Sequence, residues 1–413
     1  MKIVLLNYSD HIGGASRAAY RLHNALKNNN INSLMWVNNK KTINDFSVIS
    51  PTGIFKKVLI KIRPYISWVL TKTLKTNNSI NHSPSVFSSN WLHIINSSDI
   101  DIIHLHWPHR EMLSISDIGK IKKPIVWTLH DMWAFCGAEH YTNDSRWIEG
   151  YKANNRPKNE SGFDLNMWTW KRKFKHWKIP IQIVTPSNWL ATCTRKSALM
   201  KNWQTSVIPN PINTEFWKPL DKGPCRDYFN LPKNIPLVLY GAIDGTKDQR
   251  KGFDLLKNSL KHLQNNIALD SFQLVVFGKS KPEYKNIYGF KINYLGQIDD
   301  DFVLRKLYSA VNAMVIPSRQ ENLPNTGLEA HACALPLIAF HIGGMSDIVD
   351  NKHSGYLAKP FDIQDLANGI DWVIKNSITK NLSINARERA ISLFSDKVIV
   401  EQYMSLYKKI LIK

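Results

Sequence analysis

Cysteine is scarce in this chain, and long apolar runs are missing. The 413 residues include four cysteines: Cys136, Cys193, Cys225 and Cys333. They show no paired spacing, which argues against a disulfide framework or a zinc finger and predicts reduced thiols in a cytosolic protein. No stretch approaches the roughly 18 uninterrupted apolar residues of a membrane-spanning helix. The first apolar run is short and broken by Asn7 and Asp10, which predicts a β-strand rather than the core of a signal peptide.

The sequence also lacks internal repeats of solenoid period and long low-complexity tracts, so a repeat protein and a disordered chain are both excluded. Hydrophobic residues make up 43% and aromatic residues 11% of the chain, which are values typical of globular proteins. A chain of this length is too long for one ordinary core, and we therefore expect two or more domains.

Acidic residues are few, and their scarcity is uneven. The formal net charge is +21, and residues 1–205 carry 28 Lys and Arg against 12 Asp and Glu. Residues 46–98 contain no acidic residue at all. A basic surface attracts nucleic acid, anionic lipid or phosphorylated substrates, and charge alone does not choose among them. No zinc spacing or RNA-binding signature is present, so we expect no nucleic-acid partner.

The acid-free stretch contains a segment with helical spacing of apolar residues and interspersed basic residues. Pro64 is expected to kink or split this helix. With Trp68, the segment is suited to lie in an anionic membrane surface, but an ordinary core-facing helix with a solvated basic face fits the pattern equally well. The apolar positions are Phe55, Val58, Leu59, Ile62, Ile66, Val69, Leu70 and Leu74, and the basic ones are Lys56, Lys57, Lys61, Arg63, Lys72 and Lys75.

The first half of the chain reads as alternating strands and helices. A strand over 2–8 is followed by Gly13-Gly14 and a helix start, without the Gly-x-Gly-x-x-Gly fingerprint of dinucleotide binding. Further strands are expected over 101–107 and 124–133. The second of these runs into His130-Asp131, at the carboxyl end of a strand, where ligand-facing residues belong in open α/β sheets.

The second half contains the most informative stretch, a predicted strand–loop–helix–strand unit. Apolar runs over 313–318 and 335–340 predict buried parallel strands, with a helix over 328–334 between them. Asn325, Thr326 and Gly327 lie where N-cap and first-turn residues belong, so their backbone amides predict an anion site. Glu321 and Glu329 flank this site, and a carboxylate beside a phosphate is best suited to bind neutral hydroxyl groups of a ribose or hexose.

The paired glutamates, followed by Gly343-Gly344 and by the Asn-Lys-His-Ser-Gly-Tyr-Leu run over 351–357, resemble the donor-binding half of bacterial glycosyltransferase family 4. The resemblance covers nearly the whole chain and is closest to enzymes of envelope polysaccharide, O-antigen or colanic-acid synthesis. It implies an α/β GT-B fold, in which two Rossmann-like domains face each other across a cleft. The domains are expected at 1–208 and 225–395, with a linker at 209–224 and a C-terminal helix at about 396–413 that returns to the first domain.

The resemblance also implies roles for residues on the donor side. Lys251, ahead of a helix, would contact the diphosphate, and Arg250 would supply a second cation because Ala242 stands where many relatives carry arginine. Glu321 would hold sugar hydroxyls and Glu329 ribose hydroxyls. The remaining implied donor-binding residues are Gly13, Gly14, Asn322, Leu323, Asn325, Thr326, Gly327 and Leu328.

On the acceptor side, the resemblance implies that His130 contacts the donor sugar and that Asp131 faces acceptor or sugar hydroxyls. The implied reaction moves a hexose, with retention, from a nucleoside-diphosphate sugar (UDP before GDP) to a lipid-linked oligosaccharide or lipopolysaccharide hydroxyl. We expect no cofactor and no metal, and a peripheral location at the inner face of the cytoplasmic membrane. The alternatives are a nucleotide-sugar epimerase of the same fold and, motivated by the charge, a basic nucleic-acid-binding protein.

Overall fold

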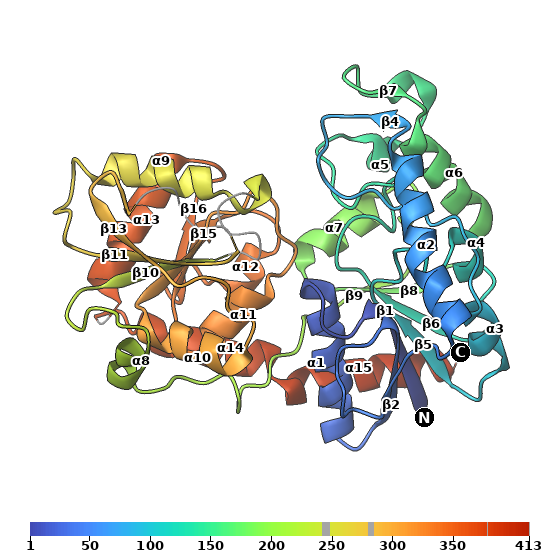
Figure 1. Ribbon diagram of the computed structural model, residues 1–413, viewed down its shortest axis with the longest axis horizontal. Helices are drawn as coiled ribbons and strands as arrows, with labels where there is room; N and C mark the ends of the chain where they lie inside the picture. Colours follow the sequence, from blue (N-terminus) through green and yellow to red (C-terminus); the bar gives the residue numbers. More distant parts are fainter. Residues whose placement is uncertain (242–247, 280–284, 378, 413) are drawn as a thin grey trace. The chain divides into compact units, whose positions relative to one another are not determined.

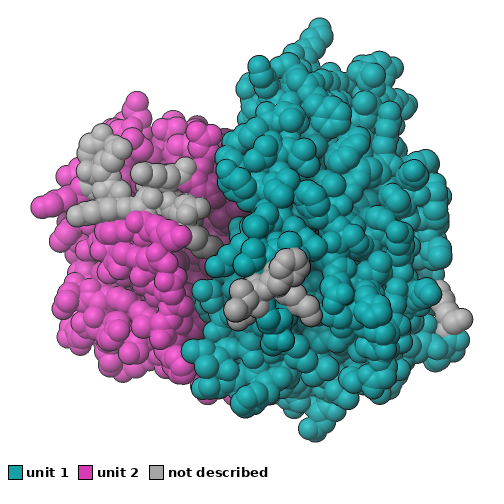
Figure 2. Space-filling model, turned by 45° about the vertical axis from the view of Figure 1, so that its right-hand side comes forward, with its two compact units in different colours: residues 1–210, 399–413 teal, residues 211–398 magenta. Residues whose placement is uncertain are grey.

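The computed structural model describes residues 1–241, 248–279, 285–377 and 379–412, apart from the side chains of residues 54–57. The chain forms two compact units, which Figure 2 shows in different colours. Unit 1 comprises Met1–Asn210 and Ile399–Lys413, and unit 2 comprises Pro211–Val398. Each unit has its own sheet, and each is described here by itself.

Unit 1 is built on a parallel sheet with the strand order β3-β2-β1-β5-β6-β8-β9. The central strands carry near-continuous apolar runs, as expected for strands covered by helices on both faces. The expected strands over 2–8, 101–107 and 124–133 are all present. The strands are β1 (Lys2–Ser9), β2 (Asn32–Asn39), β3 (Val48–Ile49), β5 (Ile102–Leu105), β6 (Ile125–Thr128), β8 (Gln182–Thr185) and β9 (Thr205–Val207).

The helices of unit 1 include α15, which comes from the end of the chain. Its residues Tyr403 and Tyr407 are buried in the same apolar cluster as β1 and α1. Figure 1 labels the helices α1 (Gly14–Asn28), α2 (Ile54–Thr71), α3 (Trp91–Ser97), α4 (Ile115–Ile118), α5 (Arg146–Glu149), α6 (Leu165–His176), α7 (Asn188–Lys196) and α15 (Asp396–Leu411).

Pro64, which was expected to kink or split this segment, lies inside the single helix α2. The helix continues through this proline without being split. A proline removes only one backbone hydrogen bond, and the residues on both sides keep the helix hydrogen-bonded. Just beyond the helix, β4 (Leu74–Lys75) pairs antiparallel with β7 (Ser161–Gly162), which joins this segment to the stretch before α6.

Unit 2 is built on a second seven-stranded sheet with the order β12-β13-β11-β10-β14-β15-β16. Within the described part of this sheet, only the pairing of β12 with β13 is antiparallel. The strands are β10 (Leu237–Gly241), β11 (Gln273–Phe277), β12 (Asn286–Ile287), β13 (Phe290–Tyr294), β14 (Ala313–Ile316), β15 (Leu337–Phe340) and β16 (Gly355–Ala358).

Two apolar clusters in unit 2 lie between this sheet and its helices. The unit is thus a second Rossmann-like layer structure, and the expected α/β class with two parallel sheets is confirmed. Its helices are α8 (Lys222–Tyr228), α9 (Phe253–Leu263), α10 (Asp301–Ala310), α11 (Asn325–Ala332), α12 (Met345–Ile348), α13 (Ile363–Asn376) and α14 (Leu382–Phe394).

The segment expected as a linker is part of a folded unit. Residues 211–224 belong to unit 2, and both Ile212 and Trp217 are buried in its core. Prolines marked this segment as irregular, but they do not prevent the apolar residues between them from packing.

Among the described residues, none of the helices is long and apolar enough to span a membrane.

Candidate functional site

A small hollow opens at the carboxyl ends of β10 and β14, the place where parallel sheets bind ligands. Its volume is about 230 Å³, including its open mouth. Lys251, Glu321 and Thr326, which lie far apart in the chain, all line it. The other lining residues are Tyr240, Gly241, Val315, Ile316, Pro317 and Ser318.

Glu321 is the buried anion of this hollow. Its Oε1 accepts hydrogen bonds from Lys251 Nζ and, at 2.9 Å, from Ser318 Oγ, and Arg250 Nη1 lies 3.8 Å away. Burial alone would raise the pKa of Glu321, but the two cations outweigh it, so that its pKa lies below the ordinary value. The carboxylate is therefore ionised and can accept hydrogen bonds from a bound hydroxyl group.

Two glycines let the backbone close around this cluster. Gly252 has φ +69°, and a Cβ at this position would lie 1.9 Å from the carbonyl oxygen of Pro317. Gly343 has φ +52°, and its Cβ would lie equally close to the carbonyl oxygen of Glu321. The next amide, of Gly344, donates to that same oxygen at 3.2 Å. Glycine is required at position 343 because a side chain would collide with the Glu321 carbonyl group. The Gly344 amide then holds the Glu321 loop through its hydrogen bond.

The start of α11 differs in detail from the expected anion site. Pro324 is the N-cap residue, and Asn325, Thr326 and Gly327 are the first three helical residues. The amides of Gly327 and Leu328 donate to the carbonyl oxygen of Pro324. A Cβ on Gly327 would lie 3.1 Å from Ile348 Cδ1, so this glycine serves packing against the core. Thr326 is the residue of this turn that faces the hollow.

Several other expected donor residues lie beneath the surface. Glu329 is buried, and its Oε2 accepts a hydrogen bond of 2.9 Å from the Tyr308 hydroxyl. Asn322 and Leu323 are buried as well. The hollow itself is lined by Lys251, Glu321 and Thr326, and Glu329 is not among its lining residues. The substitution at Ala242 lies outside the described residues, while Arg250 donates to the carbonyl oxygen of Gln320 at 3.2 Å.

In unit 1, the Gly13-Gly14 pair forms the turn between β1 and α1. Gly13 has φ +87° and is the N-cap residue, and Gly14 is the first helical residue. A Cβ on Gly13 would meet nothing within 4 Å. The backbone conformation, rather than crowding by neighbouring atoms, therefore requires glycine here.

The His130-Asp131 pair lies beyond the end of β6, as predicted, but the two side chains have different partners. His130 Nε2 lies 3.0 Å from His106 Nδ1, and burial lowers the pKa of His130 to about 4, so that it is neutral. Asp131 Oδ2 pairs with His140 Nδ1 at 2.6 Å and accepts a hydrogen bond of 3.0 Å from Trp107 Nε1. Burial would raise the pKa of Asp131, but His140 and His109 lower it well below its usual range.

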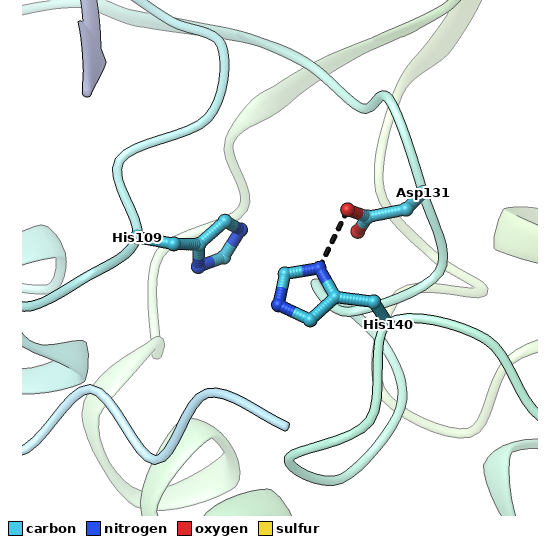
Figure 3. A group of neighbouring side chains, drawn as sticks. All are labelled: His109, Asp131 and His140. Atoms are coloured by element: carbon cyan, nitrogen blue, oxygen red, sulfur yellow. Dashed lines mark hydrogen bonds and ion pairs between the residues drawn. The ribbon is translucent and has the colours of Figure 1, made fainter. Parts of the chain in front are cut away.

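Sequence reasoning missed the residues around Asp131. Figure 3 shows the His109 ring facing the pair formed by Asp131 and His140. His109 is buried, and its Nδ1 has no hydrogen-bond partner in the part of the chain that the structure describes. No fixed spacing announces this cluster, since His109 follows β5 whereas Asp131 and His140 both follow β6. The only signal was the polar His-Asp end of a strand.

The cluster of His109, Asp131 and His140 has the residue types of a metal site, with ligand atoms within 4.8 Å of one another. The hydrogen bonds favour another interpretation. Both oxygens of Asp131 are engaged, because Trp133 N donates to Oδ1 at 3.0 Å while His140 and Trp107 hold Oδ2. The arrangement is that of an aspartate whose two oxygens are fixed in orientation by hydrogen bonds.

Both halves of the chain match known protein families. Residues 12–216 match the family model described as "Glycosyltransferase Family 4", and residues 237–376 match "Glycosyl transferases group 1". These matches give no support to the epimerase alternative.

Among curated proteins, the chain is similar to the capsular polysaccharide biosynthesis glycosyltransferase CapM of Staphylococcus aureus. The two are 30% identical over 219 residues, which are 44% of this chain and 58% of CapM. A second relative is "UDP-Gal:alpha-D-GlcNAc-diphosphoundecaprenol alpha-1,3-galactosyltransferase" of Escherichia coli, 26% identical over 49% of this chain and 53% of that protein. The chain thus spans a little over half the length of these relatives.

Solved structures share the fold across the whole chain. Sucrose-phosphate synthase from Thermosynechococcus elongatus has a TM-score of 0.68 with 19% identity and full coverage of both chains. Anabaena Alr3699/HepE, solved in complex with UDP, has a TM-score of 0.63 with 15% identity and covers 99% of this chain and 100% of its own. These likenesses confirm the GT-B fold. Two family models in the expected order, on two Rossmann-like units, show that the chain belongs to glycosyltransferase family 4.

Proposed function

We propose that this protein is a retaining hexosyltransferase, which moves a sugar from a UDP-sugar to a hydroxyl group of a lipid-linked oligosaccharide in the synthesis of a bacterial surface polysaccharide. The single observation that carries the proposal is the ionised Glu321 held between Lys251 and Arg250, in a hollow at the carboxyl ends of β10 and β14. Cations for a diphosphate and an anion for hydroxyl groups lie side by side there.

The chemistry of the proposed step follows from these charges. When the bond between the sugar and the diphosphate breaks, negative charge grows on the leaving oxygen and positive charge at the anomeric carbon. Lys251 and Arg250 stabilise the diphosphate, and the start of α11 adds the positive end of a helix dipole. Glu321 accepts hydrogen bonds from the sugar hydroxyls and orients the ring. Transfer on the face of the leaving group, with a diphosphate oxygen taking the proton, retains the configuration.

The proposed donor and acceptor are supported by the ligands and the substrate that are named for similar proteins. Structures of HepE contain UDP and UDP-glucose, and the E. coli relative acts on a diphosphoundecaprenol-linked sugar. A UDP-sugar and a lipid-linked acceptor at the inner face of the cytoplasmic membrane are the matching proposal for this chain. Two cations and a helix terminus replace a divalent ion, so that EDTA should leave the transfer rate unchanged.

Release of free nucleoside diphosphate from a panel of UDP- and GDP-sugars, without acceptor, tests this proposal. One donor should be hydrolysed slowly, and Lys251→Ala should reduce the rate by about 100-fold or more, because a charged contact to the leaving group is lost. Lys261→Ala on the exposed side of α9 is the matched control and should behave as wild type. Silence across the panel, together with no thermal stabilisation by UDP or GDP, would reject the proposal.

A further inference from the structure

The side of α2 that faces the rest of unit 1 is only partly apolar. Leu59 and Leu70 are half-buried on this side, and Ser67 is buried between them. Ser67 Oγ donates a hydrogen bond of 2.6 Å to Glu111 Oε1. Of the apolar positions expected on this helix, Leu59 and Leu70 are thus half-buried, whereas Val58, Ile62, Ile66 and Val69 are exposed.

The outward side of α2 is strongly apolar as well. Its apolar side chains are 43% to 65% exposed: Val58, Ile62, Tyr65, Ile66, Trp68 and Val69. Val58, Ile62, Tyr65 and Val69 follow the spacing i, i+4, i+7 and i+11, so they form one stripe along the helix. In Figure 1, α2 lies in front of the other elements of unit 1. Scattered apolar residues on a surface are ordinary, but a continuous stripe of this length marks an interaction surface.

Basic side chains border this stripe. Lys61 and Lys72 are exposed, and Lys72 Nζ lies 4.7 Å from the centroid of the Trp68 ring. Residues 46–98 supply no carboxylate that would neutralise them within the segment. An anionic bilayer surface has an apolar interior, an interface that favours Trp and Tyr, and negatively charged head groups. The apolar side chains, the Trp and Tyr rings and the lysines of α2 match these three regions.

A second copy of the chain fits this surface less well. In a two-fold dimer, the same patch would meet itself, and Lys61 and Lys72 of one copy would approach those of the other without acidic partners. An anionic bilayer instead places negative charge at the border of the stripe.

We infer that α2 docks on an anionic lipid bilayer through its outward face, and that the bond between Ser67 and Glu111 ties the docked helix to the acceptor-side loop. Glu111 Oε2 accepts hydrogen bonds of 2.7 Å from the amides of Val86 and Phe87, so its position is fixed. The same loop carries Trp107, which donates to Asp131. Docking of α2 thus brings the loop beside Asp131 close to lipid-linked molecules. The link between docking and a lipid-linked acceptor rests on the proposed function.

Co-sedimentation of the full-length protein with vesicles tests the inference. Wild type should bind phosphatidylcholine–phosphatidylglycerol vesicles, bind pure phosphatidylcholine vesicles weakly, and lose binding as salt rises. Ile62→Glu should weaken binding about tenfold or more, because a charge enters the stripe. Lys61→Gln and Lys72→Gln should each weaken it about fivefold. Ile384→Glu is the matched control, because Ile384 is similarly exposed on helix α14 of unit 2.

Each outcome has a defined meaning. Equal binding of wild type and Ile62→Glu, or no binding to anionic vesicles, would overturn the inference. A lipid-free dimer that Ile62→Glu converts to a monomer would assign the stripe to a second copy and overturn it as well. UDP binding, measured in the same preparations, separates this result from the proposed function. A wild-type protein that binds UDP but not anionic vesicles contradicts only the docking surface, and one that binds vesicles but not UDP contradicts only the proposed function.

Discussion

At the scale of a single residue, Glu321 is the buried anion that Lys251 and Arg250 approach in the hollow of unit 2. Replacing it with glutamine removes the anion while keeping the shape of the side chain. We expect Glu321→Gln to lower the rate of sugar transfer or donor hydrolysis by about 100-fold or more, because the contact acts on a transition state in a water-poor site. The unfolding curve should show a folded protein. Glu388→Gln, an exposed position on α14 with the same change of charge, should leave the rate unchanged.

The pH dependence of the same variant provides a second measurement. Because the pKa of Glu321 is lowered in the folded state, its pairing adds stability above the ordinary carboxyl pKa, and this contribution is lost as pH falls through the lowered value. Wild type should therefore lose more unfolding free energy than Glu321→Gln between neutral pH and pH values below about 4. Parallel pH profiles for the two proteins would contradict the charge assignment.

Gly252 fixes the backbone next to Lys251. Gly252→Ala adds a Cβ in a left-handed conformation and against the Pro317 carbonyl, so we expect a loss of about 2 kcal/mol or more in unfolding free energy. Donor hydrolysis should fall as well, because Lys251 moves with its neighbour. Gly296→Ala is the control, since Gly296 has φ +75° but no atom within 4 Å of its Cβ position. Urea unfolding should show a clearly smaller loss for this variant, and equal losses would contradict the proposed steric clash.

At the scale of elements, α15 is attached to unit 1 by buried polar contacts as well as apolar ones. The Tyr407 hydroxyl lies 2.7 Å from His104 Nδ1, and the Tyr403 hydroxyl lies 3.0 Å from Thr128 Oγ1. His104 and Thr128 are in turn 2.8 Å apart. This network connects α15 with β5 and β6, the two strands that precede the loops carrying His109 and Asp131.

We expect Tyr407→Phe to cost about 1 to 3 kcal/mol of unfolding free energy, because a buried nitrogen of His104 loses its partner. Amide hydrogen exchange should quicken along α15 before it does so elsewhere in unit 1. Tyr228→Phe, at an exposed position of unit 2, should change neither quantity. A Tyr407→Phe protein as stable as wild type would show that the apolar contacts alone attach α15.

At the scale of the whole molecule, the two units have separate apolar cores. A ligand that binds one unit should therefore stabilise that unit and slow hydrogen exchange mainly there. UDP at about 100 times its dissociation constant should stabilise the unit that binds it by roughly 2.7 kcal/mol. Hydrogen exchange should slow around residues 248–252 and 321–326 of unit 2. The Lys251→Ala protein should show little of this protection. Protection of unit 1 alone would contradict the assignment of the nucleotide to unit 2.

The sequence by itself determined the element types, most of their order and the class of the fold. The apolar run 313–316 indicates a buried strand, and the apolar spacing of 301–310 indicates a helix. Both patterns are readable because side chains repeat every two residues in a strand and every 3.6 in a helix. The resemblance to glycosyltransferase family 4 assigned Glu321 and Lys251 to the donor side together, and the ends of parallel strands, which meet at one edge of a sheet, are where such a site belongs.

Only the tertiary structure decided which distant side chains meet and which surfaces remain uncovered. It placed His109 and His140 around Asp131, buried Glu329 against Tyr308, gave Gly327 a packing role and included residues 211–224 in unit 2. It also left Val58, Ile62, Ile66 and Val69 of α2 exposed, while Leu59 and Leu70 are half-buried. Periodicity records the local conformation of a segment, whereas contacts between segments depend on how the whole chain packs, and no local pattern encodes that.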